Sequence, residues 1–173
     1  MTSPRGQDTV VVRPARHEDV PAAANLAAAL VREHHGYDPQ RFMCIEPIED
    51  GYERFLRGQV GRDGVAFLVA VVSRDRNDLV VGYVLGSLEE RDWSDLRDGC
   101  GKIHDVYVDA SVRQRGVATR LMEGAIARLE AMGAPRVVLM AAWRNERARR
   151  FFEGLGFRST MLEMTREGRE RDA

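Results

Sequence analysis

The segment VRQRGVATRL, residues 112–121, places two arginines beside small residues where a helix is expected to begin. The first N–H groups of a helix lack partners within the helix, and the helix dipole makes that end partly positive. Gly116 and Ala118 leave the backbone open to a ligand, and Arg113 and Arg115 add charged donors. The segment therefore predicts an anion site, although an ordinary strand-to-helix turn with solvated arginines has the same composition.

The residue spacing of this segment limits which kind of anion it could bind. It has neither the Lys-Ser/Thr pair of a Walker A loop nor the three glycines of GxGxxG. The pattern favours a pyrophosphate ligand of another kind, with a nucleotide phosphate as an alternative.

A second candidate group lies in the expected strand GKIHDVYVD, where His104 and Asp105 interrupt an apolar run. The ordinary pKa of histidine, about 6.5, suits proton transfer at neutral pH. Successive side chains of a strand point to opposite faces, so we expect only one of the two to face a reacting group. A hydrogen-bonded structural histidine and an aspartate that caps or pairs with an arginine are the competing interpretations.

The elements around these residues alternate between strand and helix. The hydrophobic patterns predict strands at 9–15, 65–73, 78–88, 101–109, 136–142 and 156–166, and helices at 20–34, from Pro47 to the turn at 61–64, 116–132 and 145–155. Asp19 is the expected N-cap of the first helix and Gly36 its stop. The apolar strand 136–142 is typical of a strand buried on both faces.

This order predicts the fold class. The two strands at 65–88 form an antiparallel hairpin, and the strand-helix-strand order from 103 to 141 implies a right-handed parallel crossover. We expect an α/β (α+β) fold with a mixed, mainly antiparallel sheet, one central parallel pair and flanking helices. One domain spans 9–166, between polar tails at 1–8 and 167–173.

Composition excludes several functions. The chain has 173 residues, 44% hydrophobic and 31% charged, with a net charge of -1, which argues against a nucleic-acid partner. Two cysteines without CxxC spacing, no apolar run long enough for a membrane span and no signal peptide predict a cytoplasmic protein. Cys100, His104 and the His34-His35 pair fit no zinc pattern, so we expect no metal.

Two motifs carry a family resemblance. The run RQRGVA resembles the Arg/Gln-x-x-Gly-x-Gly/Ala signature of the Gcn5-related N-acetyltransferases (GNAT), with matches at Arg113, Gly116 and Ala118. The run NERARRFFEGLGF resembles the Asn-x-x-Ala-x-x-Phe-Tyr-x-x-x-Gly-Phe segment of the same family. The N-terminal VVRPARHED is similar to the family's opening strand and first helix, so the resemblance spans residues 10–166.

The resemblance implies the acyl-CoA N-acyltransferase fold and acetyl-CoA as co-substrate. The cofactor's pantetheine arm would pair with the strand backbone at Val106, Tyr107 and Val108, and Asn145, also a plausible N-cap, would hydrogen-bond the same arm. Phe152 would contact the cofactor. The pyrophosphate would lie on the turn formed by Arg113, Gln114, Arg115, Gly116, Val117, Ala118 and Thr119.

The implied reaction is acetyl transfer to a primary amine by direct attack. An alkylamine has a pKa of about 10, so a proton must be removed before attack. His104 is the expected base, acting through water, and Asp105 is expected to position the substrate ammonium or relay its proton.

One departure from the family pattern bears on activity. The family's usual general acid is a tyrosine, and the matching residue here is Phe152. A thiol with a pKa of about 8.5 gives a fair leaving group, so the change predicts slower turnover or a substitute donor. Tyr107 matches a packing position instead. An acyl-CoA-binding regulatory or interaction module with little turnover is the alternative function.

The acceptor is the open part of this interpretation, because the sequence fits either a small-molecule or a peptide amine. The acidic run with Glu89, Glu90, Asp92 and Trp93 attracts a cationic amine or forms a solvated face. Trp143 lines the acceptor cleft or packs beneath the sheet. The last strand could also pair with a second copy in a homodimer.

Overall fold

In the computed structural model, which describes residues 9–74 and 77–168, five strands form one sheet in chain order, β1-β2-β3-β4-β5. The predicted tail at 1–8, most of the tail at 167–173 and the tip of the β2–β3 hairpin lie outside the described residues. The strands are β1 (Val10–Pro14), β2 (Val65–Arg74), β3 (Asn77–Glu89), β4 (Cys100–Val108) and β5 (Val137–Leu139), and the α-helices are α1 (Val20–Tyr37), α2 (Ile48–Arg57), α3 (Val117–Ala131) and α4 (Glu146–Gly154).

The pairing of the strands confirms the predicted fold class. β1 through β4 pair antiparallel, and β4 pairs with β5 in parallel after the α3 crossover. The parallel pair lies at the edge of the described sheet, not in its centre, because no further strand adds to β5.

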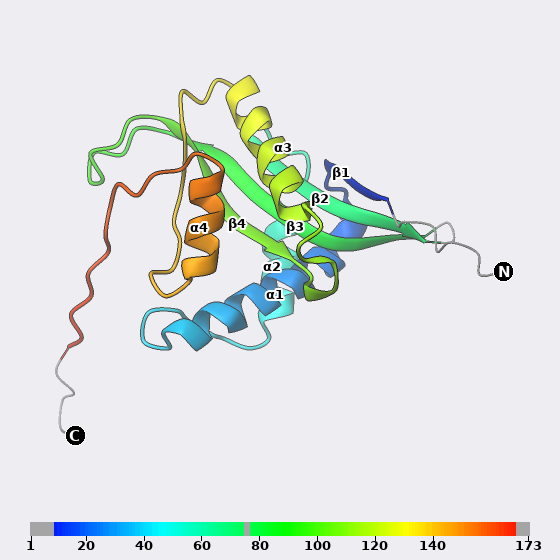
Figure 1. The fold of residues 1–173 in the computed structure, drawn as a ribbon, viewed down its shortest axis with the longest axis horizontal. Helices are drawn as coiled ribbons and strands as arrows, with labels where there is room; N and C mark the ends of the chain where they lie inside the picture. The colour runs from blue at the N-terminus through cyan, green and yellow to red at the C-terminus, as the bar shows by residue number, and fades with distance from the viewer. Residues whose placement is uncertain (1–8, 75–76, 169–173) are drawn as a thin grey trace.

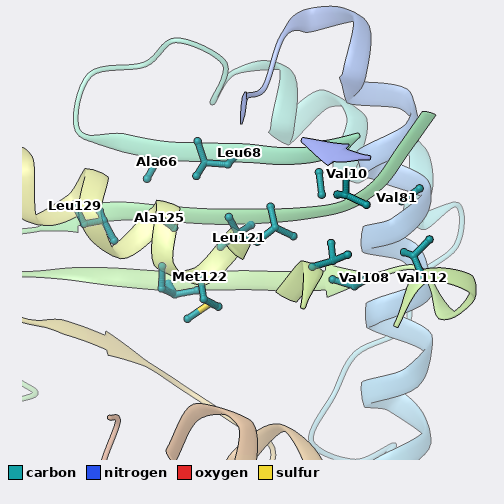
Figure 2. Close-up of a cluster of buried hydrophobic side chains, with 14 of the residues drawn as sticks. Val10, Ala66, Leu68, Val81, Val108, Val112, Leu121, Met122, Ala125 and Leu129 are labelled. Carbon is teal, nitrogen blue, oxygen red and sulfur yellow. The ribbon is translucent and has the colours of Figure 1, made fainter. Parts of the chain in front are cut away.

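Helices cover both faces of the sheet (Figure 1). On one face, α3 packs Leu121, Met122, Ala125 and Leu129 against β1 to β4, and Figure 2 shows these side chains in one layer along the sheet with Ala66 and Leu68. On the other face, α1 and α2 cover a second cluster around Phe67 and Tyr83. The two apolar clusters pack the sheet between helices on both faces, so β4 is held in place by buried contacts on each side.

The first helix is longer than predicted. α1 continues through Gly36 to Tyr37, because a glycine inside a helix costs only about 1 kcal/mol and Asp38 ends the helix instead. Asp19 lies at the N-cap position, but its carboxylate does not cap the helix. It accepts two hydrogen bonds from the Arg13 guanidinium, at 2.7 and 2.9 Å, and one from the Arg16 N–H at 2.7 Å.

Two predictions about the C-terminal strands were wrong. β5 spans only Val137–Leu139 and is half-buried, and Met140 after it is 72% exposed. The expected strand at 156–166 is absent, and the chain after α4 runs away from the sheet as an extended segment (Figure 1). A strand needs a neighbouring strand, and none lies beside this segment in the described sheet. Its contacts with the rest of the protein include the ion pair of Arg41 with Glu163.

In the part of the chain that the structure describes, no helix is both long and apolar enough to cross a membrane.

Candidate active site

The candidate site begins where β4 separates from β5. The two strands pair only at Gly101, Lys102 and Ile103, opposite residues 137–139, whereas β4 continues to Val108. From residue 104 onward, the edge of β4 that faces β5 has no strand partner in the described sheet. Unpaired backbone groups of this kind need hydrogen bonds from another source, such as an extended ligand.

The hydrogen bonds on the other edge of β4 show which groups are open. The Asp109 N–H donates to the Val81 carbonyl at 2.8 Å, so this residue points its backbone groups toward β3. Because these groups alternate between the two edges of a strand, Val106 and Val108 direct theirs toward the open edge, where the Val108 carbonyl already accepts from Arg113 Nε. The sequence predicted pantetheine pairing at Val106, Tyr107 and Val108. Tyr107 instead lies opposite Tyr83 and directs its backbone groups toward β3.

A β-bulge in β4 corrects the prediction that His104 and Asp105 point to opposite faces. Gly86 pairs with Ile103 and Leu85 pairs with Asp105, so His104 is an extra residue without a partner on β3. Bulges interrupt the alternation of side chains along a strand. Asp105 shares the face of Leu85 under α1 and α2, and His104 turns to the same face, where its Nε2 lies 2.7 Å from Ser87 Oγ.

Two tyrosines lie around the half-buried carboxylate of Asp105. Burial raises the pKa of Asp105, and the Tyr83 and Tyr52 hydroxyls oppose the shift. Burial also raises the pKa of Tyr52 to about 12 and that of Tyr83 well above its ordinary value, with the Asp105 charge adding to both. The Tyr83 hydroxyl is fully buried and has no hydrogen bond within the described residues. A half-buried carboxylate in this position suits an ammonium or amine ligand.

His104 belongs to a hydrogen-bonded group on the same face. Its side chain is 33% exposed, and its Nε2 lies 3.4 Å from Glu89 Oε1. Burial lowers the pKa of His104 below 6.5, while the Glu89 charge acts in the opposite direction. The lowered pKa favours the neutral imidazole, which is the form that can accept a proton.

The predicted anion site lies at the start of α3. Gln114 and Gly116 have φ of 65° and 70°, so the turn alternates into the left-handed region at these two positions. Such turns direct successive N–H groups into one concavity. The first helix N–H with a backbone acceptor is that of Arg120, on Gly116 O at 3.1 Å. Val117 is buried and Ala118 and Thr119 are half-buried, which fixes the helix end against the sheet.

The two arginines of the turn differ. The Arg113 side chain folds back over β4 instead of facing the turn: its Nε donates to the Val108 carbonyl at 3.0 Å, and its guanidinium lies 5.1 Å from the centre of the Tyr107 ring. Arg113 Nη2 also lies 3.5 Å from Glu33 Oε2 on α1. Arg115 is exposed, so it is the arginine of the pair that remains oriented to solvent at the turn.

Asn145, which precedes α4, and Phe152, within it, both have structural roles. Asn145 is the N-cap of α4, and its Oδ1 accepts from the Ala148 N–H at 3.0 Å, which leaves its amide NH2 for another partner. Phe152 is 9% exposed and packs against Phe151 and Phe157 in the α3-side core.

The residues that the sequence suggested for contact with the acceptor have different surroundings in the structure. Glu89 joins His104, whereas Asp92 accepts from the N–H groups of Ser94 and Asp95 and stabilises its own loop. Glu90 is exposed, and Trp93 and Trp143 are 75% and 68% exposed, so neither tryptophan packs beneath the sheet. The Arg149 guanidinium lies 4.5 Å from the centre of the Trp143 ring.

The sequence interpretation missed Tyr52, Tyr83 and Ser87. Both tyrosines stand in apolar patterns that predict core residues, and nothing local marks their hydroxyls. The register of β3 with β4 is what brings Tyr83 and Ser87 beside Asp105 and His104.

The fold and the opening in the sheet define a class of acyl-transferring proteins, and comparison of the sequence gives the family. The sequence pattern of the acetyltransferase (GNAT) family matches residues 28–157, so the chain belongs to this family. It is an acyltransferase, and its general reaction is acetyl transfer. No curated protein matches the chain.

Solved structures share the fold at low sequence identity. The BH1408 protein from Bacillus halodurans, as a tetramutant, is 22% identical with a TM-score of 0.76, over 91% of this chain and 99% of its own. The aminoglycoside N-acetyltransferase AAC(6')-Iy, in complex with CoA, is 18% identical with a TM-score of 0.72, over 97% and 99%. Glucosamine-6-phosphate N-acetyltransferase from Arabidopsis thaliana is 16% identical with a TM-score of 0.66, over 92% and 98%.

Proposed function

We propose that the protein transfers the acetyl group of acetyl-CoA to a primary amine by direct attack, within one domain at residues 9–166. The observation that carries the proposal is the open edge of β4 at Val106 and Val108, which leads directly into the turn before α3. An extended pantetheine arm fits the open edge, and a pyrophosphate fits the helix end. The CoA-bound aminoglycoside acetyltransferase of the same fold supports this choice of co-substrate.

The reaction requires a neutral amine at the thioester carbon. Asp105 would hold the incoming ammonium, and a water would carry its proton to His104. The amine nitrogen then bonds to the carbonyl carbon, and the N–H of Val106 stabilises the oxyanion. The nitrogen of the tetrahedral intermediate then loses a second proton to solvent, and collapse of the intermediate breaks the C–S bond. Phe152 cannot donate a proton, so the thiolate, with a pKa of about 8.5, takes one from solvent.

The acceptor that we favour is a small-molecule amine, as in the aminoglycoside and glucosamine-6-phosphate acetyltransferases of similar fold. A regulatory module that binds acyl-CoA without turnover is the second candidate, and the buried Phe152 in place of a tyrosine favours it.

A titration with acetyl-CoA followed by a thiol-release assay over a panel of amines separates the two candidates. We expect binding, and thiol release with at least one primary amine in the panel. Tight binding without release from any small or peptide amine indicates the module. Competition by ATP that acetyl-CoA does not match would indicate a nucleotide-phosphate site instead.

A further inference from the structure

The Ser87 hydroxyl lies between the Glu89 carboxylate and the His104 imidazole, on the face of β3 and β4 that carries Asp105. Ser87 Oγ is 2.8 Å from Glu89 Oε1 and 2.7 Å from His104 Nε2. Glu89 Oε1 is also 3.4 Å from Nε2. These three groups form a compact hydrogen-bonded set beside Asp105, in which the proposed function uses His104 alone.

The position of the single hydroxyl proton follows from the charges. An ionised carboxylate only accepts hydrogen bonds, so Glu89 needs the Ser87 proton at 2.8 Å. With that proton directed to Glu89, the Ser87 oxygen has only lone pairs to offer the ring nitrogen. The ring must then carry its own proton on Nε2 and donate it to Ser87, which leaves Nδ1 without a proton.

We propose that Glu89 and Ser87 are positioning residues that hold His104 in the Nε2–H tautomer, so that Nδ1 is the atom that accepts the proton from the acceptor amine. The inference rests on the proposed function, in which His104 is the base. In the transfer, one N–H bond of the amine breaks, a proton passes through water to Nδ1, and the imidazolium that forms is balanced by the Glu89 carboxylate.

The charged groups that act on His104 come from two strands. Glu89 of β3 and Asp105 of β4 favour the imidazolium, and Lys102 of β4 opposes it together with burial. Glu89 lies within ion-pair distance of the ring, so its removal has a definite sign: the imidazolium loses a counter-charge and the pKa of His104 falls further.

The first test is the pH profile of kcat/KM. A base acts when deprotonated, so the acidic limb follows the pKa of His104. We expect Glu89→Gln to move this limb to lower pH by about 0.5–1 unit, because the pair is only partly screened by solvent. The matched control is Asp78→Asn at the other end of β3, whose carboxylate likewise accepts from a serine, Ser73, at 2.8 Å. Asp78→Asn should leave the acidic limb at its wild-type pH. The proposal is overturned if Glu89→Gln does not move the limb, or if Asp78→Asn moves it by the same amount.

The second test separates positioning from charge. Ser87→Ala frees the imidazole to adopt either tautomer, and we expect kcat to fall about 10-fold with the KM for acetyl-CoA unchanged. Ser87→Thr keeps the hydroxyl and should restore most of kcat. Wild-type kcat in Ser87→Ala, or a loss that Ser87→Thr does not rescue, contradicts the assigned role.

A third measurement needs no substrate. Nitrogen-15 spectra of the histidine-labelled full chain, with the His104 signals assigned through His104→Gln, report which ring nitrogen carries the proton. Above the pKa of His104 we expect the proton on Nε2 in the wild type and a mixture of tautomers in Ser87→Ala. A proton on Nδ1 in the wild type overturns the proposal. If no amine supports thiol release, the proposed function fails while this result still tests the hydrogen-bonded set.

Discussion

Replacing Gly116 with aspartate should weaken acetyl-CoA binding about 100-fold, or by about 2.7 kcal/mol, while the protein stays folded. Gly116 has φ of 70° at the N-cap of α3, and a Cβ placed there meets no atom within 4 Å. Aspartate tolerates this left-handed conformation better than most residues do. Its carboxylate, however, would occupy the anion site and repel the pyrophosphate. The measurement is the dissociation constant for acetyl-CoA by calorimetry.

The chain supplies a matched control at the other end of the same helix. Gly133 has φ of 98°, and a Cβ there also meets nothing within 4 Å. Gly133→Asp introduces the same charge and a similar backbone strain next to the helix C-terminus, where a negative charge is unfavourable. We expect this variant to be less stable than Gly116→Asp yet to bind acetyl-CoA nearly as the wild type does. Equal losses of affinity in the two variants would refute the pyrophosphate site.

Replacing Asp105 with asparagine should lower kcat about 100-fold and raise the melting temperature at pH 7. The side chain keeps its shape but loses the charge that we assign to the substrate ammonium. The effect on stability follows from the raised pKa of Asp105 in the folded protein. The folded state holds the proton more tightly than the unfolded chain, so the ionised carboxylate costs stability once the pH rises through the native pKa.

The pH dependence distinguishes this effect from a general change in packing. Below the ordinary carboxyl pKa of 3.8, Asp105 is protonated in both states, so the stability advantage of Asp105→Asn should disappear. Asp109 is the control with the opposite sign: hydrogen bonds from Ser111 lower its pKa, so Asp109→Asn should be slightly less stable at pH 7. An Asp105→Asn variant that is fully active, or less stable than the wild type at pH 7, would contradict the role of this carboxylate.

Much of the fold followed from local sequence patterns. The hairpin, the helix after the glycine turn and the Asn145 cap each depend on residues close together in the chain, and the structure confirms them. The strand at 156–166 failed for the opposite reason. Its composition suits a strand, but a strand needs a partner, and β5 gains none in the described sheet.

In the candidate site, too, features set by neighbouring residues could be predicted, and features set by the pairing of distant strands could not. The structure has a left-handed turn at Gly116 and no β5 partner opposite Val106 and Val108, and the ligands that the sequence assigned to these residues stay predictions. The bulge at His104 was not predicted, because it depends on the register of β3 against β4 rather than on the sequence of β4. The same register places Ser87 against His104, which no periodicity in the sequence could indicate.

Hydrogen exchange at the amides of Val106 and Val108 tests the central claim most directly. If the pantetheine arm of acetyl-CoA pairs with the open edge of β4, saturating acetyl-CoA should slow exchange at these two amides. Adenosine 3',5'-bisphosphate, which lacks the pantetheine arm, should leave them unchanged. Exchange at Val106 and Val108 that acetyl-CoA does not alter, while calorimetry shows that it is bound, would contradict the account.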